Sequence, residues 1–142
     1  MFITNINTRS LFRCVLLAIL IGATPAAAEP LDVTIYENGG DGQMAECTLE
    51  QVAGLKANGD GFLAVRTGPG SNYRKIDQLH NGDYVLVYDG SHFPWVGVLY
   101  GHGQEVLNSN TGCGFVGEGK RPLPYPGKKG WIHSNWLQSV AG

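Results

Sequence analysis

The chain carries the two residue types needed for thiol catalysis, a pair of cysteines and several histidines. A thiolate beside an imidazole base is the arrangement that cysteine hydrolases use. Neither Cys47 nor Cys113 follows a strand-to-helix turn or begins a helix, the settings that lower the pKa of a thiol. The histidines are His80, His92, His102 and His133. A small Cys–His hydrolase is therefore kept as an alternative, and the main prediction is that the protein is not an enzyme.

Metal-binding patterns are weak. No Cys-x-x-Cys and no helically spaced pair of histidines occurs in the sequence. The segment 56–61 looks like part of a calcium loop, but Lys56 stands at the first ligand position and Thr67 at the twelfth, where carboxylates are required. The segment therefore predicts a turn, and we expect neither a metal nor another cofactor.

Aromatic side chains are the more informative group. Tyr and Trp combine an apolar face with a polar tip, so they suit sugar stacking and peptide grooves. The alternative is that most of them pack in the core. The residues concerned are Tyr73, Tyr84, Tyr88, Trp95, Tyr100, Trp131 and Trp136. Arg66 has a similar pair of interpretations, because it can bind a ligand carboxylate or pair with an acid such as Asp83.

The first 28 residues have the order of a secretory signal. Arg9 and Arg13 lead into an apolar run at 14–21, and three alanines ending at Ala28 supply a cleavage site. The apolar run is too short to cross a bilayer core of roughly 30 Å as a helix. We expect cleavage after Ala28, a periplasmic or secreted protein, and no membrane span after the signal is removed. An uncleaved anchor is the alternative.

Cleavage leaves 114 of the 142 residues, which suits one small domain. Loss of two arginines lowers the basic count from 10 to 8 against 12 acidic residues, a formal net charge of −4. A nucleic-acid partner requires a strongly basic face, so none is expected. The 21 glycines and the short apolar runs predict an all-β domain. An even pair of cysteines in an exported chain predicts a Cys47–Cys113 disulfide, with two free thiols as the alternative.

The stretch 62–73 organises the predicted domain. Leu63 and Val65 point to one face of a strand, and Gly-Pro-Gly at 68–70 forces a turn that brings Tyr73 back toward it. The pattern Leu-x-Val-Arg-x-Gly-Pro-x-x-x-Tyr, with Gly-Trp-Ile-His at 130–133, resembles the bacterial Src-homology-3 (SH3b) family over about residues 61–137. The resemblance implies a small SH3-like β-barrel at 47–142, preceded by a polar N-terminal segment at 29–46.

The remaining strands follow from short apolar runs between turn residues. They are predicted at 33–36, 47–55, 84–88, 95–100, 130–133 and 136–140, with loops at 38–42 and 72–79. Both faces of 84–88 are apolar, so we expect core on one face and loops or ligand on the other. Gly97 marks a bend or a close backbone approach. Val65 and Trp131 are predicted to be buried.

One long inserted loop departs from the simple family pattern. Residues 101–129 replace a tight turn, and a loop of this length requires an anchor. The predicted disulfide through Cys113 supplies that anchor.

The resemblance also implies a function. Domains of this family often bind peptidoglycan or envelope proteins, so a non-catalytic binding module for peptidoglycan or another cell-envelope component is expected. In SH3-like barrels the loops that precede Trp95 and carry Tyr73 lie near one another, which predicts a ligand-binding groove lined by these two rings. The alternative is an adaptor or inhibitor that binds an envelope protein through the barrel groove.

Overall fold

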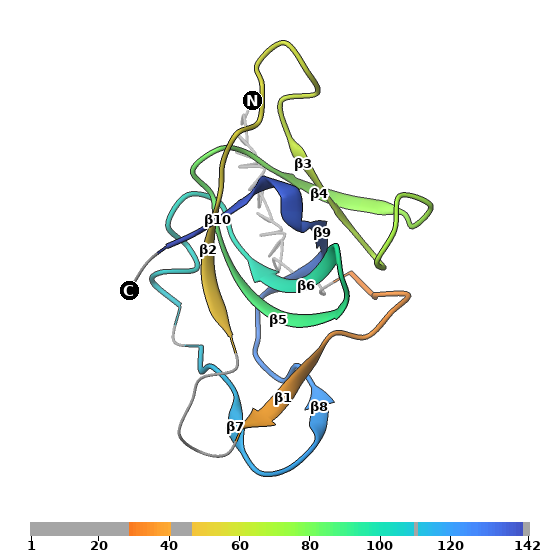
Figure 1. The fold of residues 1–142 in the computed structure, drawn as a ribbon, viewed down its shortest axis with the longest axis vertical. Helices are drawn as coiled ribbons and strands as arrows, with labels where there is room; N and C mark the ends of the chain where they lie inside the picture. The colour runs from red at the N-terminus through yellow and green to blue at the C-terminus, as the bar shows by residue number, and fades with distance from the viewer. Residues whose placement is uncertain (1–28, 41–46, 110, 141–142) are drawn as a thin grey trace, which may run out of the picture.

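A computed structural model describes residues 29–40, 47–109 and 111–140 (Figure 1). The predicted signal at 1–28 lies outside these residues. The described chain is all-β, as predicted, and its one helical element is a single 3-10 turn. No helix in these ranges is long and apolar enough to cross a membrane.

The strands are short, and only β5 exceeds six residues. Their bounds are β1 Tyr36–Gly40, β2 Thr48–Val52, β3 Leu63–Arg66, β4 Lys75–Leu79, β5 Tyr84–His92, β6 Trp95–Tyr100, β7 Phe115–Val116, β8 Lys120–Pro122, β9 Lys128–His133 and β10 Leu137–Ser139, with the 3-10 turn η1 at Ser134–Trp136.

Seven strands form one antiparallel sheet in the order β10-β2-β5-β6-β9-β3-β4 (Figure 1). Within the described ranges the edge strands β10 and β4 do not pair with each other, so hydrogen bonding does not close the sheet into a barrel. The sheet nevertheless curls, because Val52 on β2 and Leu79 on the far edge belong to the same buried cluster.

The strand β4 lies where the sequence predicted a loop. The stretch does not alternate strictly, because Ile76 and Leu79, which were expected to pack inward, are three positions apart. Leu79 is fully buried and Ile76 packs against the same cluster. Pairing with β3 converts the loop into an edge strand, with a register shift after Val65.

A second, three-stranded sheet has the order β7-β1-β8. Strand β1 pairs in parallel with β7 and antiparallel with β8, and Figure 1 shows this small sheet beside the ends of β5 and β2. The predicted strand at 33–36 is therefore displaced, and the expected loop at 38–40 is strand. Gly39 permits the close approach, because a Cβ there would collide with the carbonyl oxygen of Gly117.

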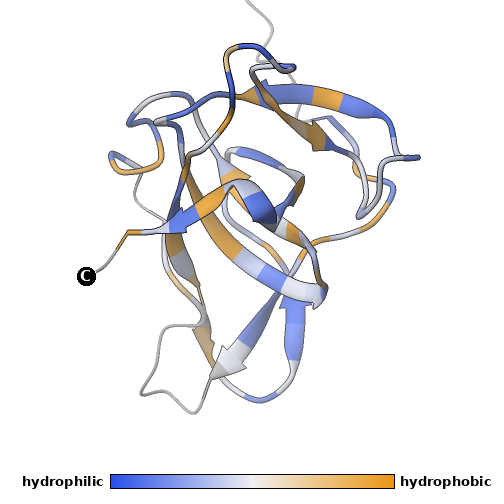
Figure 2. Ribbon diagram, turned by 45° about the horizontal axis from the view of Figure 1, so that its top comes forward, coloured by the Kyte–Doolittle hydropathy of each residue, from blue (hydrophilic) through white to orange (hydrophobic). Residues whose placement is uncertain are grey.

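Both faces of the seven-stranded sheet are buried, each in its own cluster. The inner cluster contains Val52, Leu63, Val65, Leu79, Val85, Val96, Val98, Tyr100 and Ile132. The outer cluster contains Ile35, Tyr88, Leu99, Val106, Leu123 and Trp131. Figure 2 shows hydrophobic stretches within the strands of the large sheet.

The two-sided burial agrees with the prediction for 84–88. Val85 lies in the inner cluster and Tyr88 in the outer one. Segments outside the sheet cover the outer cluster. Val65 and Trp131 are both 0% exposed, as predicted, although they lie on opposite faces.

The described part of the N-terminal segment packs on the outer face. The indole Nε1–H of Trp131 donates to the carbonyl oxygen of Val33 at 2.9 Å. The backbone N–H groups of Asp32 and Val33 donate to the carbonyl oxygen of Thr67 at 2.9 and 3.1 Å. Residues 31–35 therefore lie on the sheet and supply Ile35 to the outer cluster.

The predicted disulfide is present between Cys47 and Cys113, whose Cα atoms are 5.1 Å apart. It joins the start of β2 to the insertion between β6 and β9. That insertion has structure of its own, because it contains β7 and β8 and contributes Val106 and Leu123 to the outer cluster.

Candidate functional site

Trp95 lies at the start of β6 in a row with two histidines. It is the register partner of His92 across β5 and of His133 across β9. Partners on antiparallel strands share a face, so the three side chains stand side by side on the outer face. We call His92, Trp95 and His133 the Trp95 row.

The rings of this row meet edge to face. The centroids of Trp95 and His133 are 5.3 Å apart with an interplanar angle of 77°. The ring of His92 meets the buried Trp131 at 5.2 Å and 87°. Exposure rises along the row, from half-buried His133 and Trp95 to exposed His92, and Phe93 beyond it is 76% exposed. The row is therefore the accessible end of the outer face.

The hydrogen bonding of His133 determines what the row offers to a ligand. Its Nδ1 accepts from the backbone N–H of Asn135 at 3.3 Å, as the N-cap of η1. In the neutral ring the proton then resides on Nε2, which becomes a donor. The N–H of Ser134 donates to the carbonyl oxygen of Pro94 at 2.9 Å, which ties η1 to the β5–β6 connection. The row combines aromatic faces with a donor, and so suits stacking with hydrogen bonding.

Tyr73, the other predicted ligand residue, packs on the turn that precedes it. A Cβ on Gly68 would collide with the tyrosine ring, and one on Gly70 would lie 3.3 Å from it. The N–H of Tyr73 donates to the carbonyl oxygen of Gly70 at 3.2 Å. The half-buried ring therefore fills the space that the two glycines leave, as the predicted turn requires.

Arg66 is bonded within the fold, but to a backbone carbonyl and not to the acid that was expected. Its Nη1 donates to the carbonyl oxygen of Tyr73 at 2.8 Å. Asp83, the acid suggested as its partner, instead accepts from the backbone N–H groups of His80 and Gly103 at 2.8 and 2.7 Å. Arg66 thus holds the turn against β3.

The strand register separates Tyr73 from Trp95. Arg66 lies opposite Trp131, and β3 and β9 run in opposite directions. Trp95 lies opposite His133 at the end of β9, whereas Tyr73 follows the end of β3 and so lies toward the start of β9. The two rings are therefore near opposite ends of β9. They do not line a common groove, as was expected.

A polar cluster that the sequence did not predict joins β4, the turn before β5 and the start of the insertion. His102 lies with its two ring nitrogens 3.6 Å from carboxylate oxygens of Asp77 and Asp83. Asp77 also accepts from the hydroxyl of Tyr100 at 3.1 Å and lies 3.5 Å from Nζ of Lys128.

Hydrogen bonding outweighs burial at Asp77. Burial acts to raise its pKa, but hydrogen bonds from the backbone N–H of Gln78 and the hydroxyl of Tyr100, with the charge of Lys128, lower it overall. Burial, followed by the charge of Asp77, raises the pKa of Tyr100.

In the described ranges there is no group of three or more His, Cys, Asp or Glu residues that could hold a metal ion. Because Asp83 of this cluster accepts from the N–H of Gly103, the cluster anchors the start of the insertion.

A buried ion pair was also missed. Glu37 is fully buried, and its Oε1 accepts from Nε of Arg121 at 2.6 Å. Its Oε2 has no hydrogen-bond partner among the described residues. The two residues are 84 positions apart, so no local pattern pairs them. The available signal was the two-residue spacing of Ile35 and Glu37, which puts both on one face of a strand.

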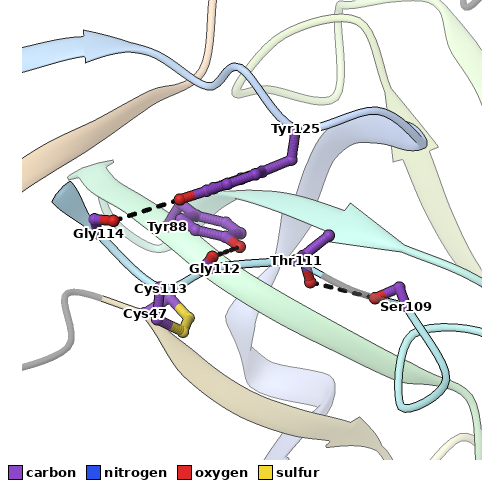
Figure 3. The surroundings of a disulfide bond; sticks show 8 residues. All are labelled: Cys47, Tyr88, Ser109, Thr111, Gly112, Cys113, Gly114 and Tyr125. Atoms are coloured by element: carbon purple, nitrogen blue, oxygen red, sulfur yellow. Dashed lines mark hydrogen bonds between the residues drawn. A yellow bond between two sulfur atoms is a disulfide. The ribbon is translucent and has the colours of Figure 1, made fainter.

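Two tyrosines hold the backbone on either side of Cys113 (Figure 3). The hydroxyl of Tyr88 donates to the carbonyl oxygen of Gly112 at 2.7 Å, and that of Tyr125 to Gly114 at 3.2 Å. Burial, with the negative charge of neighbouring groups, raises the pKa of Tyr88 to about 12. Both sulfur atoms of the disulfide are bonded to each other, so neither is a free thiolate.

Comparisons of this chain with protein-family models, with curated proteins and with solved structures find no match. The proposal below therefore depends on the residues and geometry just described.

Proposed function

We propose that this protein is an exported, non-catalytic binding module of SH3-like architecture whose ligand is peptidoglycan or another cell-envelope component. The residues of the SH3b-like pattern have roles consistent with that proposal. Val65 is buried in the inner cluster, Gly68 and Gly70 accommodate the ring of Tyr73, and Trp131 is buried in the outer cluster. These contacts indicate that the residues of the SH3b-like pattern stabilise the fold.

The observation that carries the binding proposal is the Trp95 row. An indole face next to an Nε2–H donor on His133 suits a ring or chain that is apolar on one side and bears hydroxyl or amide acceptors. Peptidoglycan presents both features in its sugar rings and in its peptide stems. The exposed ring of Phe93 extends the contact surface beyond His92. Trp95 is therefore the central binding residue of the proposal.

The disulfide supports both the location and the non-catalytic assignment. Disulfides persist in oxidising compartments such as the periplasm and the extracellular medium. A Cys–His hydrolase needs a free thiolate, and the bond between Cys47 and Cys113 occupies both sulfur atoms. This favours the binding module over the hydrolase alternative.

The test is a titration of the mature protein with purified peptidoglycan and with soluble muropeptides. Trp95→Ala should weaken binding about tenfold, since an aromatic contact contributes about 0.5–1.5 kcal/mol beyond its area. Trp136→Ala is the matched control, because that indole is 38% exposed on η1 and lies near Gly54, outside the row. It should change the affinity less than twofold.

Two results would reject the proposal in different parts. Equal binding by wild type and Trp95→Ala would remove the Trp95 row as the site. Absence of binding to any peptidoglycan fraction, with specific capture of one envelope protein, would favour the adaptor or inhibitor alternative. Circular dichroism of each variant checks that the fold is retained.

A further inference from the structure

The insertion forms a cover over part of the outer face. We define the cover as residues 101–109 and 111–127. Val106 and Leu123 from the cover are buried against the outer cluster, and Tyr125 packs on Tyr88 with ring centroids 5.7 Å apart. Gly127 lies against Leu99, since a Cβ on it would be 3.6 Å from that side chain. The cover therefore shields apolar residues of β5 and β6 from water.

The strand pairing of the cover is limited, and single hydrogen bonds to Asp83, Tyr88 and Ile35 add to it. Strand β7 has two residues and β8 has three, and within the described chain both pair only with β1. Every residue of β8 is exposed, and Figure 2 shows this strand in hydrophilic colours. A short, exposed edge strand contributes little burial, so its pairing opens readily.

The buried ion pair between β1 and β8 stabilises the closed state less than a fully hydrogen-bonded pair would. Glu37 is 0% exposed, yet among the residues that the structure describes only one of its carboxylate oxygens has a hydrogen-bond partner, Arg121. A buried carboxylate oxygen without a hydrogen bond loses its hydration and gains nothing in return. Separation of β8 from β1 would admit water to that oxygen. Opening of the cover would break the bond to Arg121 but would also restore the hydration of the carboxylate, so the two effects oppose each other.

Besides the main chain at its two ends, the disulfide is the covalent cross-link that joins the cover to the sheet in the described residues. It connects exposed Cys113 to half-buried Cys47 at the start of β2. Cys113 is exposed between Gly112 and Gly114, which favours the approach of an external thiolate to the disulfide. An exposed cross-link that holds a segment with short strand pairings is suited to control by reduction.

We propose that the Cys47–Cys113 bond is a redox-controlled latch, whose reduction releases the cover while the seven-stranded sheet stays folded. The thiolate of a dithiol reductant attacks Sγ of Cys113, and Cys47 leaves as a thiolate that takes a proton from water. The second thiol of the reductant, after losing its proton, closes onto the mixed disulfide and releases Cys113, which is then protonated. The protein gains two electrons and two protons, and the reductant becomes a disulfide. This latch is independent of the ligand proposed for the Trp95 row.

Limited trypsin digestion of the mature protein, with and without dithiothreitol followed by alkylation, tests the latch. Lys120 lies in the cover on β8, and Lys56 lies in the exposed turn between β2 and β3, outside it. Cleavage after Lys120, relative to cleavage after Lys56, should rise at least tenfold on reduction. Lys56 serves as the internal control for general loosening. The Cys47→Ser/Cys113→Ser double variant should show the high ratio with or without the reductant.

Hydrogen exchange of β3, β6 and β9 completes the test. Their amides should keep their protection in the reduced protein, because the inner cluster does not depend on the cover. An unchanged cleavage ratio would show that the bond is a passive staple. Loss of protection throughout the sheet would show that the bond holds the whole domain. Either result overturns the proposal, and neither bears on binding at the Trp95 row.

Discussion

The side chain of Ile35 occupies the space next to Gly97 where any other residue would carry its Cβ. A Cβ built on Gly97 would lie 2.8 Å from Cγ2 of Ile35 and 3.0 Å from Cβ of Asp89. Ile35 is 2% exposed, so it has little room to move away. At Gly97, where a bend or a close backbone approach was expected, the structure shows instead the close approach of a side chain to this glycine. This contact is one of those by which the N-terminal segment meets the sheet.

The first prediction follows from that contact. Gly97→Ala should destabilise the protein by about 1–3 kcal/mol, because overpacking displaces Ile35 or shifts the backbone of β6. Urea unfolding measures the change. Gly90→Ala is the control, since a Cβ at Gly90 meets nothing within 4 Å and its backbone does not have a positive φ. Equal midpoints for the two variants would contradict the assigned packing.

A second prediction concerns the inner cluster. Val65→Ala should cost about 1–3 kcal/mol of the free energy of unfolding, from lost burial and the cavity that remains. Val116→Ala makes the same chemical change at a side chain that is 88% exposed, and should cost less than about 0.5 kcal/mol. A neutral effect of Val65→Ala in thermal and urea unfolding would require an inverted register for β3.

A third prediction concerns alkaline pH. The pKa of Tyr88 in the folded protein is raised from 10.0 to about 12. Because the folded-state pKa is the higher one, the stability contributed by the neutral phenol is complete below pH 10 and is lost as the pH rises through about 12. In a spectrophotometric titration of phenolate absorbance, Tyr88→Phe should remove a step near pH 12. The variant should also show a weaker loss of stability between pH 10 and 12. Loss of a step near pH 10 instead would contradict the raised pKa of this hydroxyl.

A fourth prediction concerns processing and oxidation. Protein recovered from the periplasm should begin at Glu29, which N-terminal sequencing measures, and a product that retains Arg9 would refute the signal. Intact mass without reductant should be lower than the reduced mass by two hydrogen atoms. Free thiols in the natively exported protein would contradict the Cys47–Cys113 bond and make the hydrolase alternative worth testing.

Much of the large sheet could be predicted from local sequence patterns. The alternation around Val65, the two apolar faces of 84–88 and the short runs at 95–100 and 130–133 each correspond to an observed strand. The disulfide followed from a count of cysteines. These features depend on neighbouring residues or on a single pairing choice, which one sequence is able to specify.

Long-range pairing accounts for most of what was missed. Residues 38–40 look like a loop because they are polar and rich in glycine, and they become strand only by pairing with β7 and β8. The buried position of Glu37 depends on Arg121 in the same way. At the candidate site, Trp95 was found by its residue type. Its partners His92 and His133 were given by strand register, which no local pattern determined.

The pairing of β1 with β8 also orders the events of folding. In the large sheet only β3–β4 and β5–β6 are joined by short connections. Leu137 of β10 pairs with Val52 of β2, and this separation in sequence is as long as the 84 positions between Glu37 and Arg121. Closing so long a stretch of chain costs entropy before any contact repays it, so distant pairings form late. The first strand to leave the ribosome is thus among the last to find its partners. Until it does, the newly made protein exposes the apolar side of its central strands, and this interval is when it is most prone to aggregate or to need a chaperone.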